Sequence, residues 1–312
     1  MRNAFAATLT ELATADERVV LLSGDIGNRL FDPYKQACPG RFLNCGVAEA
    51  NMTGMAAGMA MEGLRPFTYT ITPFATLRAM EQIRDDICYP RLPVVIVGTG
   101  SGLSYASLGP THHSCEDIAM LRSLPGMTVV CPADRAEVTA ALPEILAHDG
   151  PVYLRLGKKG EPDIHEALPA FEIGKSITLR PGHEICIVAA GPIVTLGLDA
   201  AAILADAGIS CRVESFHTVK PLDTACLGEV FQQCQIVATL EEHSTIGGLG
   251  GAVAEWRAER PRLRGQLERF GTDDRFFTQA GSQAFLREAA GLTAEAIAHR
   301  LLAAHTLLPE PC

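Results

Sequence analysis

Residues 46–58, with the sequence Gly-Val-Ala-Glu-Ala-Asn-Met-Thr-Gly-Met-Ala-Ala-Gly, place a single carboxylate, Glu49, at the start of an apolar helix rich in glycine and alanine. Burying a charged group is costly unless it has a partner, so Glu49 is a candidate functional residue. The ordinary alternative is a carboxylate that stabilises the first turn of a helix through the helix dipole. The helix taken alone leaves both interpretations open.

Apolar runs on both sides of this helix alternate with helical patterns, which is typical of α/β proteins built on parallel sheets. The apolar runs predict strands over residues 19–23, 93–97, 127–130, 151–156, 185–190, 209–215 and 235–240. The periodic segments predict helices over residues 115–124, 135–147, 194–207, 252–259 and 293–302. Asp134 is the expected N-cap of the second helix, and Gly208 ends the third. The glycine run 247–251 opens the fourth, where close helix packing or a turn distant from any cofactor is its expected use.

Glycine, proline and charged residues are frequent in residues 161–180, which predicts a linker. The expected fold class is α/β with two three-layer domains on parallel or mixed sheets, covering residues 1–160 and 181–312. Ligands of such open sheets bind at the carboxyl ends of the strands. This rule selects three candidate site segments, namely Asp25, residues 100–113 and residues 241–243.

The composition narrows the class of protein. The chain has 312 residues, of which 47% are hydrophobic, and a net charge of −10, which argues against nonspecific binding to nucleic acid. No apolar run reaches the roughly 18 residues of a membrane span, and the first residues have no signal-peptide core. The ten cysteines have no CxxC spacing, so we expect reduced, buried thiols in a cytoplasmic protein without a structural zinc site.

The motif Gly109-Pro110-Thr111-His112-His113 predicts a rigid turn that presents two imidazoles at the mouth of the first sheet. Histidine titrates near neutral pH and suits proton transfer or hydrogen bonding to a substrate oxygen. A pair of surface loop histidines is equally compatible with the motif. Adjacent histidines on one loop point in different directions, so they make a poor metal pair.

Two arginines are candidates for binding a phosphate monoester, because arginine contacts phosphate with two hydrogen bonds at once. Arg2 lies at the start of the chain and Arg155 lies at the end of a predicted strand. Surface ion pairs are the ordinary alternative for both. The glycines of residues 98–102 lack the GxGxxG spacing and are followed by a loop pattern, so we expect no dinucleotide site there.

Taken in order along nearly the whole chain, these segments resemble the transketolase family, and most of all the C-terminal subunit of transketolases split into two chains. The matching segments are residues 24–26, 46–58, 73–84, 109–112, 116–125, 132–134, 150–157, 219–223 and 241–251. The resemblance implies a pyrimidine-binding domain followed by a transketolase C-terminal domain. It also implies a transferase that moves a two-carbon ketol unit between sugar phosphates with thiamine diphosphate as its cofactor.

The resemblance implies which residues contact this cofactor. Glu49 matches the glutamate that hydrogen-bonds the pyrimidine ring and activates the cofactor, and Asp25 matches an acidic residue beside it. Phe74 lies in the region that supplies the aromatic ring stacked on the pyrimidine. The register of this region is defined to about one helical turn, which leaves Ile71 and Tyr69 as alternatives.

Substrate-binding residues follow from the same resemblance. His112 matches a histidine that hydrogen-bonds substrate oxygens, and Arg2 and Arg155 match arginines that hold the sugar phosphate. Ordinary transketolases carry a histidine and an aspartate where this chain has Gly100 and Leu108. Loss of hydrogen-bonding groups changes discrimination strongly. We therefore expect a sugar other than the usual pentose phosphate, such as a branched sugar phosphate or a specialised ketose.

The resemblance accounts for only half of the cofactor site. Family members bind magnesium and the diphosphate through a Gly-Asp-Gly motif and a downstream asparagine, a pattern that residues 23–28, Ser-Gly-Asp-Ile-Gly-Asn, do not fit. We therefore expect no metal ligand in this chain, an N-terminal partner subunit that binds the diphosphate and magnesium, and an α2β2 assembly. Small residues of the Glu49 helix would permit close packing between subunits, namely Gly54, Ala56, Ala57, Gly58 and Ala60.

Two other functions stay open. The β subunit of a 2-oxo-acid dehydrogenase decarboxylase component has the same two domains and the same glutamate, but residues 109–112, 153–157 and 220–223 look more like transketolase. A regulatory partner without turnover is the non-enzymatic alternative. The presence of Glu49, His112 and both arginines, Arg2 and Arg155, argues against it.

Overall fold

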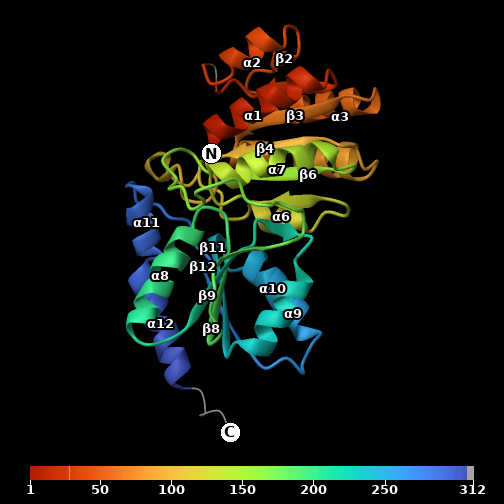
Figure 1. The fold of residues 1–312 in the computed structure, drawn as a ribbon. Coiled ribbons are helices and arrows are strands. Elements are labelled where there is room, and N and C mark those ends of the chain that lie inside the picture. The colour runs from red at the N-terminus through yellow and green to blue at the C-terminus, as the bar shows by residue number, and fades with distance from the viewer. Residues whose placement is uncertain (28, 308–312) are drawn as a thin grey trace.

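The first of two sheets contains seven strands in the order β10-β5-β6-β4-β3-β1-β2. The computed structural model describes residues 1–27 and 29–307 (Figure 1). The strands are β1 (Val19–Ser23), β2 (Phe42–Asn44), β3 (Arg65–Ile71), β4 (Val95–Thr99), β5 (Thr128–Val130), β6 (Val152–Leu156) and β10 (Thr218–Lys220). All neighbours are parallel except β10, which runs antiparallel to β5. The carboxyl ends of β1, β3, β4 and β6 therefore lie at the same edge.

Helices cover both faces of this sheet. One face carries α1 (Arg2–Ala15), α2 (Asp32–Ala37) and α7 (Arg135–Ala147). The other carries α3 (Glu49–Met61), α4 (Thr72–Thr76), α5 (Met80–Gln82), a π-helical segment (Ile83–Cys88) and α6 (Asp117–Arg122). Strands β1, β4 and β6 are completely buried between these layers, which explains their nearly continuous apolar sequences.

The second sheet has the order β12-β11-β8-β9-β7. Its strands are β7 (Ile177–Arg180), β8 (Ile185–Ala190), β9 (Cys211–Ser215), β11 (Ile236–Ser244) and β12 (Gln266–Thr272). In Figure 1, α8 (Val194–Asp206) and α12 (Ala294–Thr306) lie on one side of it, and α9 (Thr224–Gln233) and α10 (Leu249–Ala258) lie on the other. The short α11 (Gln283–Ala289) reaches back to the first domain, where Leu286 packs in one apolar cluster with Leu103 and Ala106.

The predicted α/β class with two sheets is confirmed, but the two domains are less separate than expected. Residues 177–180 of the predicted linker form β7 and pair with β9, because Ile177 and Leu179 alternate with polar neighbours as a strand requires. Conversely, strand β10 comes after β9 in the chain but pairs with β5, so it belongs to the first sheet. A continuous apolar core then joins Val129 of the first domain to Phe216 of the second.

Local signals in the sequence are borne out by the structure. The predicted strands 19–23 and 185–190 have the observed bounds, and the Asp134 side chain accepts the N-cap hydrogen bond of α7 from the Glu137 N–H at 2.9 Å. Gly208 follows α8 with a φ of +84°, which favours glycine. In the glycine run, a Cβ added at Gly248 would overlap the Glu241 carboxylate, so this run serves close packing.

Small residues of α3 were expected to form a contact between subunits, and the structure assigns most of them to the core. Ala56, Ala57 and Ala60 pack against strands of the first sheet. Only Gly58 and, in part, Gly54 are accessible from outside. The alanines therefore serve close packing of α3 on its own sheet.

Nine cysteines lie among the described residues, and all are free thiols that are buried apart from the half-buried Cys45. The tenth, Cys312, lies outside the described residues. Within residues 1–27 and 29–307, no helix combines the length and apolarity needed to cross a bilayer.

His217 fixes the linker to the second domain. It follows β9, is fully buried, and stacks on Phe171 of the linker with ring centroids 3.8 Å apart. Its Nδ1 lies 3.0 Å from the Thr218 hydroxyl. Burial lowers the pKa of His217 to about 4, with the charge of His165 acting in the same direction and Asp223 opposing it.

This environment predicts an acid-sensitive step in stability. The folded-state pKa of His217 lies below the ordinary 6.5, so its stabilising effect is complete above pH 6.5 and is lost as the pH falls toward 4. Replacement His217→Gln should remove this step, and the difference in free energy of unfolding between wild type and variant should change by about 3 kcal/mol over that range. Urea unfolding at several pH values measures it. A His299→Gln control at an exposed helix position should show no such step.

Candidate active site

Glu49 is buried at the first turn of α3, with 3% of its surface exposed. Its Oε2 accepts a hydrogen bond from Arg78 Nη1 at 3.1 Å, and its Oε1 lies 3.4 Å from the Thr70 hydroxyl at the end of β3. Gly24, directly after β1, leaves the space that the Thr70 side chain needs, because a Cβ there would lie 2.9 Å from Thr70 Oγ1. Three neighbouring elements thus hold one nearly dry carboxylate at the carboxyl edge of the sheet.

Arg78 places a flat cation between Glu49 and Phe74. Its guanidinium carbon lies 3.8 Å from the centre of the Phe74 ring, while Nη1 pairs with Glu49. Arg78 remains 46% exposed in its side chain, so the group sits at the mouth of the concavity. Arg78 was not predicted as a site residue. Its position four residues after Phe74 could have suggested it, because side chains four residues apart on a helix lie next to each other.

The structure distinguishes among the aromatic candidates. Tyr69 is fully buried and stacks on Phe5 with ring centroids 5.6 Å apart, so the alternative that placed it in the site is wrong. Ile71 is half-buried as the N-cap residue of α4. Phe74 is the aromatic ring that faces the Glu49 concavity through Arg78.

His112 lies on the other side of Phe74. Their ring centroids are 5.2 Å apart in an edge-on arrangement, and His112 Nδ1 lies 3.0 Å from the Thr111 hydroxyl. The neighbouring His113 is buried, both its ring nitrogens lack a hydrogen-bond partner, and burial lowers its pKa. The two histidines therefore occupy different environments, and His112 is the one at the mouth of the site.

Tyr105 and Lys158 complete this mouth, and neither was found from the sequence. The Tyr105 ring lies 6.1 Å from His112, and Lys158 Nζ lies 4.5 Å above the Tyr105 ring. Gly100 has a φ of +75°, and a Cβ there would overlap Tyr105. Tyr105 thus fills the space beside a position that only glycine can occupy.

The two predicted phosphate-binding arginines lie in different places. Arg2 shares a surface concavity with Lys158 and Lys159. Arg155 is buried at the domain junction, with 3% of its surface exposed, so its alternative as a surface ion pair is wrong. The structure does not bring Arg155 into the concavity at Arg2.

Arg155 is held by a network across both domains. Its Nε and Nη2 contact the Asp117 carboxylate at 2.7 and 3.2 Å, and Nη2 also donates to the carbonyls of Ser114 and Glu242. The Tyr153 hydroxyl donates to the same carboxylate. Burial by itself would raise the pKa of Asp117, but the charge and hydrogen bonds of Arg155 hold it below its usual value.

The segment 241–243 is structural in this chain and lies inside β11 rather than beyond its end. Glu241 accepts hydrogen bonds from the N–H groups of Leu249 and Gly250 and so caps α10. Burial raises the pKa of Glu241 to about 7 against the effect of these donors, and it lowers the pKa of His243 to about 4. These residues are neighbours of the Arg155 network.

Asp25 lies at the exposed end of β1 and takes a positive φ of 59°, which is rare outside glycine. Its Oδ1 accepts a hydrogen bond from Asn44 Nδ2 at 2.8 Å. Strained backbone of this kind is common at functional sites. Among the described residues, no three His, Cys, Asp or Glu side chains are placed to hold a metal ion.

Comparison with known protein families identifies the family to which the chain belongs. The transketolase pyrimidine-binding domain matches residues 1–161, and the transketolase C-terminal domain matches residues 174–297. The chain belongs to the transketolase family. A 6-deoxy-6-sulfo-D-fructose transketolase subunit of Clostridium sp. is 40% identical over 298 residues, which cover 95% of this chain and 92% of that one.

Two further relatives are also described as subunits of a transketolase or as a split transketolase. An apulose-4-phosphate transketolase subunit of Phocaeicola vulgatus is 35% identical, with 83% of this chain and 84% of that one covered. A solved structure described as a split gene transketolase, inactive beta4 tetramer, superposes with a TM-score of 0.88 at 37% identity and covers 98% of both chains. The predicted resemblance to the C-terminal subunit of a split transketolase is therefore confirmed.

Proposed function

We propose that this chain is the C-terminal subunit of a two-chain transketolase that depends on thiamine diphosphate and uses a non-standard ketose. The observation that carries the proposal is the Glu49 concavity. A flat nitrogen-bearing group, the Arg78 guanidinium, lies against Phe74 while its N–H bonds the buried carboxylate. An aminopyrimidine ring has the same flat shape and the same kind of nitrogen, so these residues fit the cofactor.

Each residue of the concavity has a proposed task toward this group. Bound thiamine diphosphate supplies the nucleophilic carbon and the electron sink for transfer of a two-carbon unit. Glu49 would share a proton with a nitrogen of the pyrimidine ring, and its burial would exclude water from that hydrogen bond. Phe74, which now packs against the Arg78 guanidinium, would stack on the pyrimidine ring, and Asp25, just after β1, would lie beside the cofactor.

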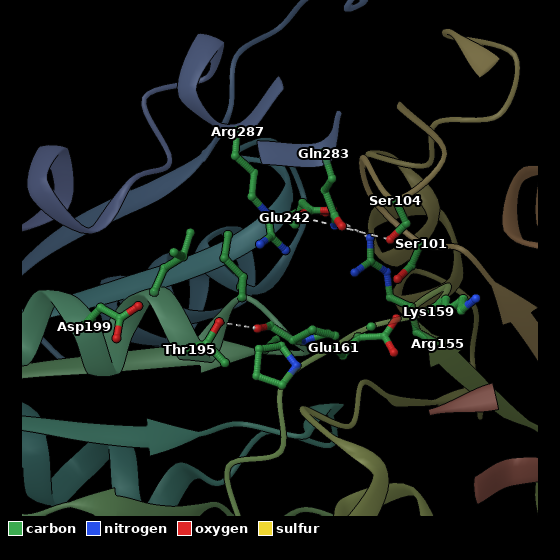
Figure 2. A pocket seen from close by; sticks show the side chains of 16 residues that line it. Ser101, Ser104, Arg155, Lys159, Glu161, Thr195, Asp199, Glu242, Gln283 and Arg287 are labelled. Carbon is green, nitrogen blue, oxygen red and sulfur yellow. Dashed lines mark hydrogen bonds and ion pairs between the residues drawn. The ribbon is translucent and has the colours of Figure 1, made fainter. Parts of the chain in front are cut away.

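Substrate binding is assigned to the mouth between His112 and Lys158. His112 donates a hydrogen bond to a substrate oxygen near the reacting carbons. Arg2, Lys158 and Lys159 surround the concavity where an anionic end of the sugar binds. Arg155 stays a proposed second contact to the sugar phosphate, because it lines a cavity (Figure 2) that shares Lys159, Gly160 and Glu161 with this concavity.

Two positions, Gly100 and Leu108, support our inference about the substrate. Tyr105 fills the space beside Gly100, and Leu108 is exposed, so two polar groups of ordinary transketolases are replaced by an aromatic and an aliphatic surface. The relatives named above act, by their names, on sulfofructose and on apulose 4-phosphate. We infer a ketose with an anionic end, phosphate or sulfonate, that differs from xylulose 5-phosphate in its carbon skeleton or substituents.

The partner is an N-terminal transketolase subunit that carries the diphosphate-binding domain and the magnesium site. The named relatives are themselves subunits of nearly the same length. The solved relative is described as an inactive tetramer of β chains. By analogy, we propose that this chain alone self-associates without activity and forms an α2β2 enzyme with its partner.

Reconstitution tests this function. The purified chain and its N-terminal partner, mixed with thiamine diphosphate and magnesium, should transfer a ketol unit from 6-deoxy-6-sulfofructose or a branched ketose phosphate to an aldose phosphate. Each chain alone should be inactive. Turnover of xylulose 5-phosphate with ribose 5-phosphate at ordinary rates would contradict the substrate assignment. Decarboxylation of pyruvate without ketol transfer would contradict the transketolase assignment.

Lys158 offers a sharper test of how the sugar is held. Lys158→Ala removes one charged contact to the anionic end of the substrate, so KM should rise about 10- to 100-fold while kcat changes little. Lys158→Arg should keep most of the affinity. Lys175→Ala, an exposed lysine of the linker, is the matched control and should leave KM unchanged. An unchanged KM in Lys158→Ala would remove Lys158 from the substrate site.

A further inference from the structure

Arg78 covers both of the groups that the pyrimidine ring of the proposed cofactor would contact in this chain. Its Nη1 donates to Glu49 Oε2 at 3.1 Å, and its guanidinium carbon lies 3.8 Å from the centre of the Phe74 ring. A planar group with N–H donors thus bonds the carboxylate and packs on the aromatic ring at the same time. An aminopyrimidine ring would make the same two contacts.

The contacts of Arg78 and those of a pyrimidine ring exclude each other. Glu49 is 3% exposed, and its other oxygen, Oε1, lies 3.4 Å from the Thr70 hydroxyl. The Phe74 ring meets His112 on its other side, with ring centroids 5.2 Å apart. The remaining carboxylate oxygen and the remaining side of the ring are those that Arg78 contacts. A pyrimidine ring reaches them only after the guanidinium has moved.

The position of Arg78 exceeds what orienting Glu49 requires. One hydrogen bond at Oε2 orients a carboxylate, and Thr70 already lies beside Oε1. The guanidinium also packs on Phe74, and Arg78 lines the concavity together with residues 47–51. Arg78 therefore reproduces the polar contact and the stacking contact of the ring together.

Arg78 can leave this position by rotation of its own side chain. The side chain is 46% exposed, whereas the Glu49 side chain is 2% exposed. Arg78 lies in the short 3₁₀ turn Leu77–Ala79, just before α5. Glu81 follows three residues later and is exposed, so it offers the displaced cation an acid at a spacing at which helical side chains meet. The displacement leaves the sheet and α3 as they are.

We propose that Arg78 is an autoinhibitory residue, whose guanidinium occupies the pyrimidine subsite of this chain and must swing out before thiamine diphosphate binds. The inference rests on the function proposed above, because it takes Glu49 and Phe74 as the contacts of the ring. Competition of this kind lowers the apparent affinity by the fraction of molecules in which the subsite is open. A cofactor that is also anchored through its diphosphate on the partner subunit has more binding free energy with which to displace Arg78. Arg78 thus makes cofactor binding depend on the partner.

Calorimetric titration of thiamine diphosphate with magnesium into the equimolar mixture of both chains tests this inference. Arg78→Ala should bind the cofactor about tenfold more tightly than wild type, because no guanidinium competes for Glu49 and Phe74. Arg78→Lys keeps the charge but not the planar group, so its affinity should lie between the two. Arg84→Ala, at an arginine of the π-helical segment whose side chain is 67% exposed, is the matched control and should bind as wild type does.

Thermal unfolding of this chain alone gives a second readout. Arg78→Ala should melt at a lower temperature than wild type, because the buried Glu49 carboxylate loses its ion pair. Stability without cofactor and affinity for the cofactor should therefore change in opposite directions. A residue that only held Glu49 in place would lower both.

Three results would overturn the inference. The first is cofactor binding by Arg78→Ala and Arg78→Lys that is equal to or weaker than that of wild type. The second is an equal gain in affinity in Arg84→Ala, which would trace the effect to net charge. The third is no binding by wild type or any variant, which would contradict the proposed function as well, whereas the first two results leave that function standing. Arg78→Lys retains an ion pair for Glu49, which keeps the test decisive if Arg78→Ala folds poorly.

Discussion

Replacement Glu49→Gln is expected to lower kcat of the reconstituted two-chain enzyme by about 100- to 10,000-fold. The substitution keeps the shape of the side chain but removes the carboxylate that we propose as the proton-holding group at the cofactor ring, and general acid–base groups contribute about this factor. Because Glu49 is 3% exposed and meets Arg78 and Thr70, the substitution leaves a nearly dry position without its carboxylate. Steady-state kinetics with the natural ketose, together with calorimetry of cofactor binding, measures the effect.

Glu62→Gln is the matched control, since Glu62 ends the same helix on its exposed side. It should retain wild-type kcat. The Glu49 variant should still assemble with the partner subunit, because the carboxylate lies in a concavity of this chain with Arg78. Activity within a factor of three of wild type in Glu49→Gln would contradict the role given to this residue.

Replacement Asp117→Asn is expected to lower the free energy of unfolding by about 3–5 kcal/mol. Breaking a buried ion pair from one side leaves the other charge without compensation. Asp117 and Arg155 are both almost completely inaccessible, and the pair also receives the Tyr153 hydroxyl. The expected effect is large because Arg155 joins strand β6 to carbonyls on both sides of the domain junction, at Ser114 and Glu242. Urea unfolding of the isolated chain at pH 7 measures it.

The control for this variant is a surface pair of the same chemistry. Arg65 and Asp149 form an ion pair at 3.3 Å in which the Asp149 side chain is 96% exposed. Asp149→Asn should change stability by less than about 1 kcal/mol, as is usual for exposed pairs. If Asp117→Asn were no more destabilising than Asp149→Asn, the junction would not depend on the Arg155 network.

The regular part of the fold was predictable because parallel strands buried on both faces leave a strong signal. Strands such as β1 and β8 are uninterrupted aliphatic runs, and the N-cap of α7 is an acid at the required spacing. Short strands at sheet edges carry little such signal. β10 has three residues and depends on β5, nearly ninety positions earlier in the chain, so only the tertiary structure defines it.

The candidate site was predictable only where sequence patterns or family resemblance point to it. The carboxyl-edge rule led to His112, and the resemblance led to both Glu49 and His112. The structure places Phe74 between Arg78 and His112. Tyr105 and Lys158 were missed because their meeting depends on Gly100, whose missing side chain makes room for the tyrosine ring. The pairing of Arg155 with Asp117 was not predicted, because a strand-end arginine looks the same in sequence whether or not a buried aspartate lies beside it.

As proposed above, this chain holds only half of the thiamine diphosphate site. Isothermal titration with thiamine diphosphate and magnesium tests it most directly, with this chain alone, the N-terminal partner alone, and their equimolar mixture as three separate samples. Tight binding, at one cofactor per pair of chains, is expected in the mixture only. Binding of thiamine diphosphate to this chain alone with the affinity of the mixture would contradict it.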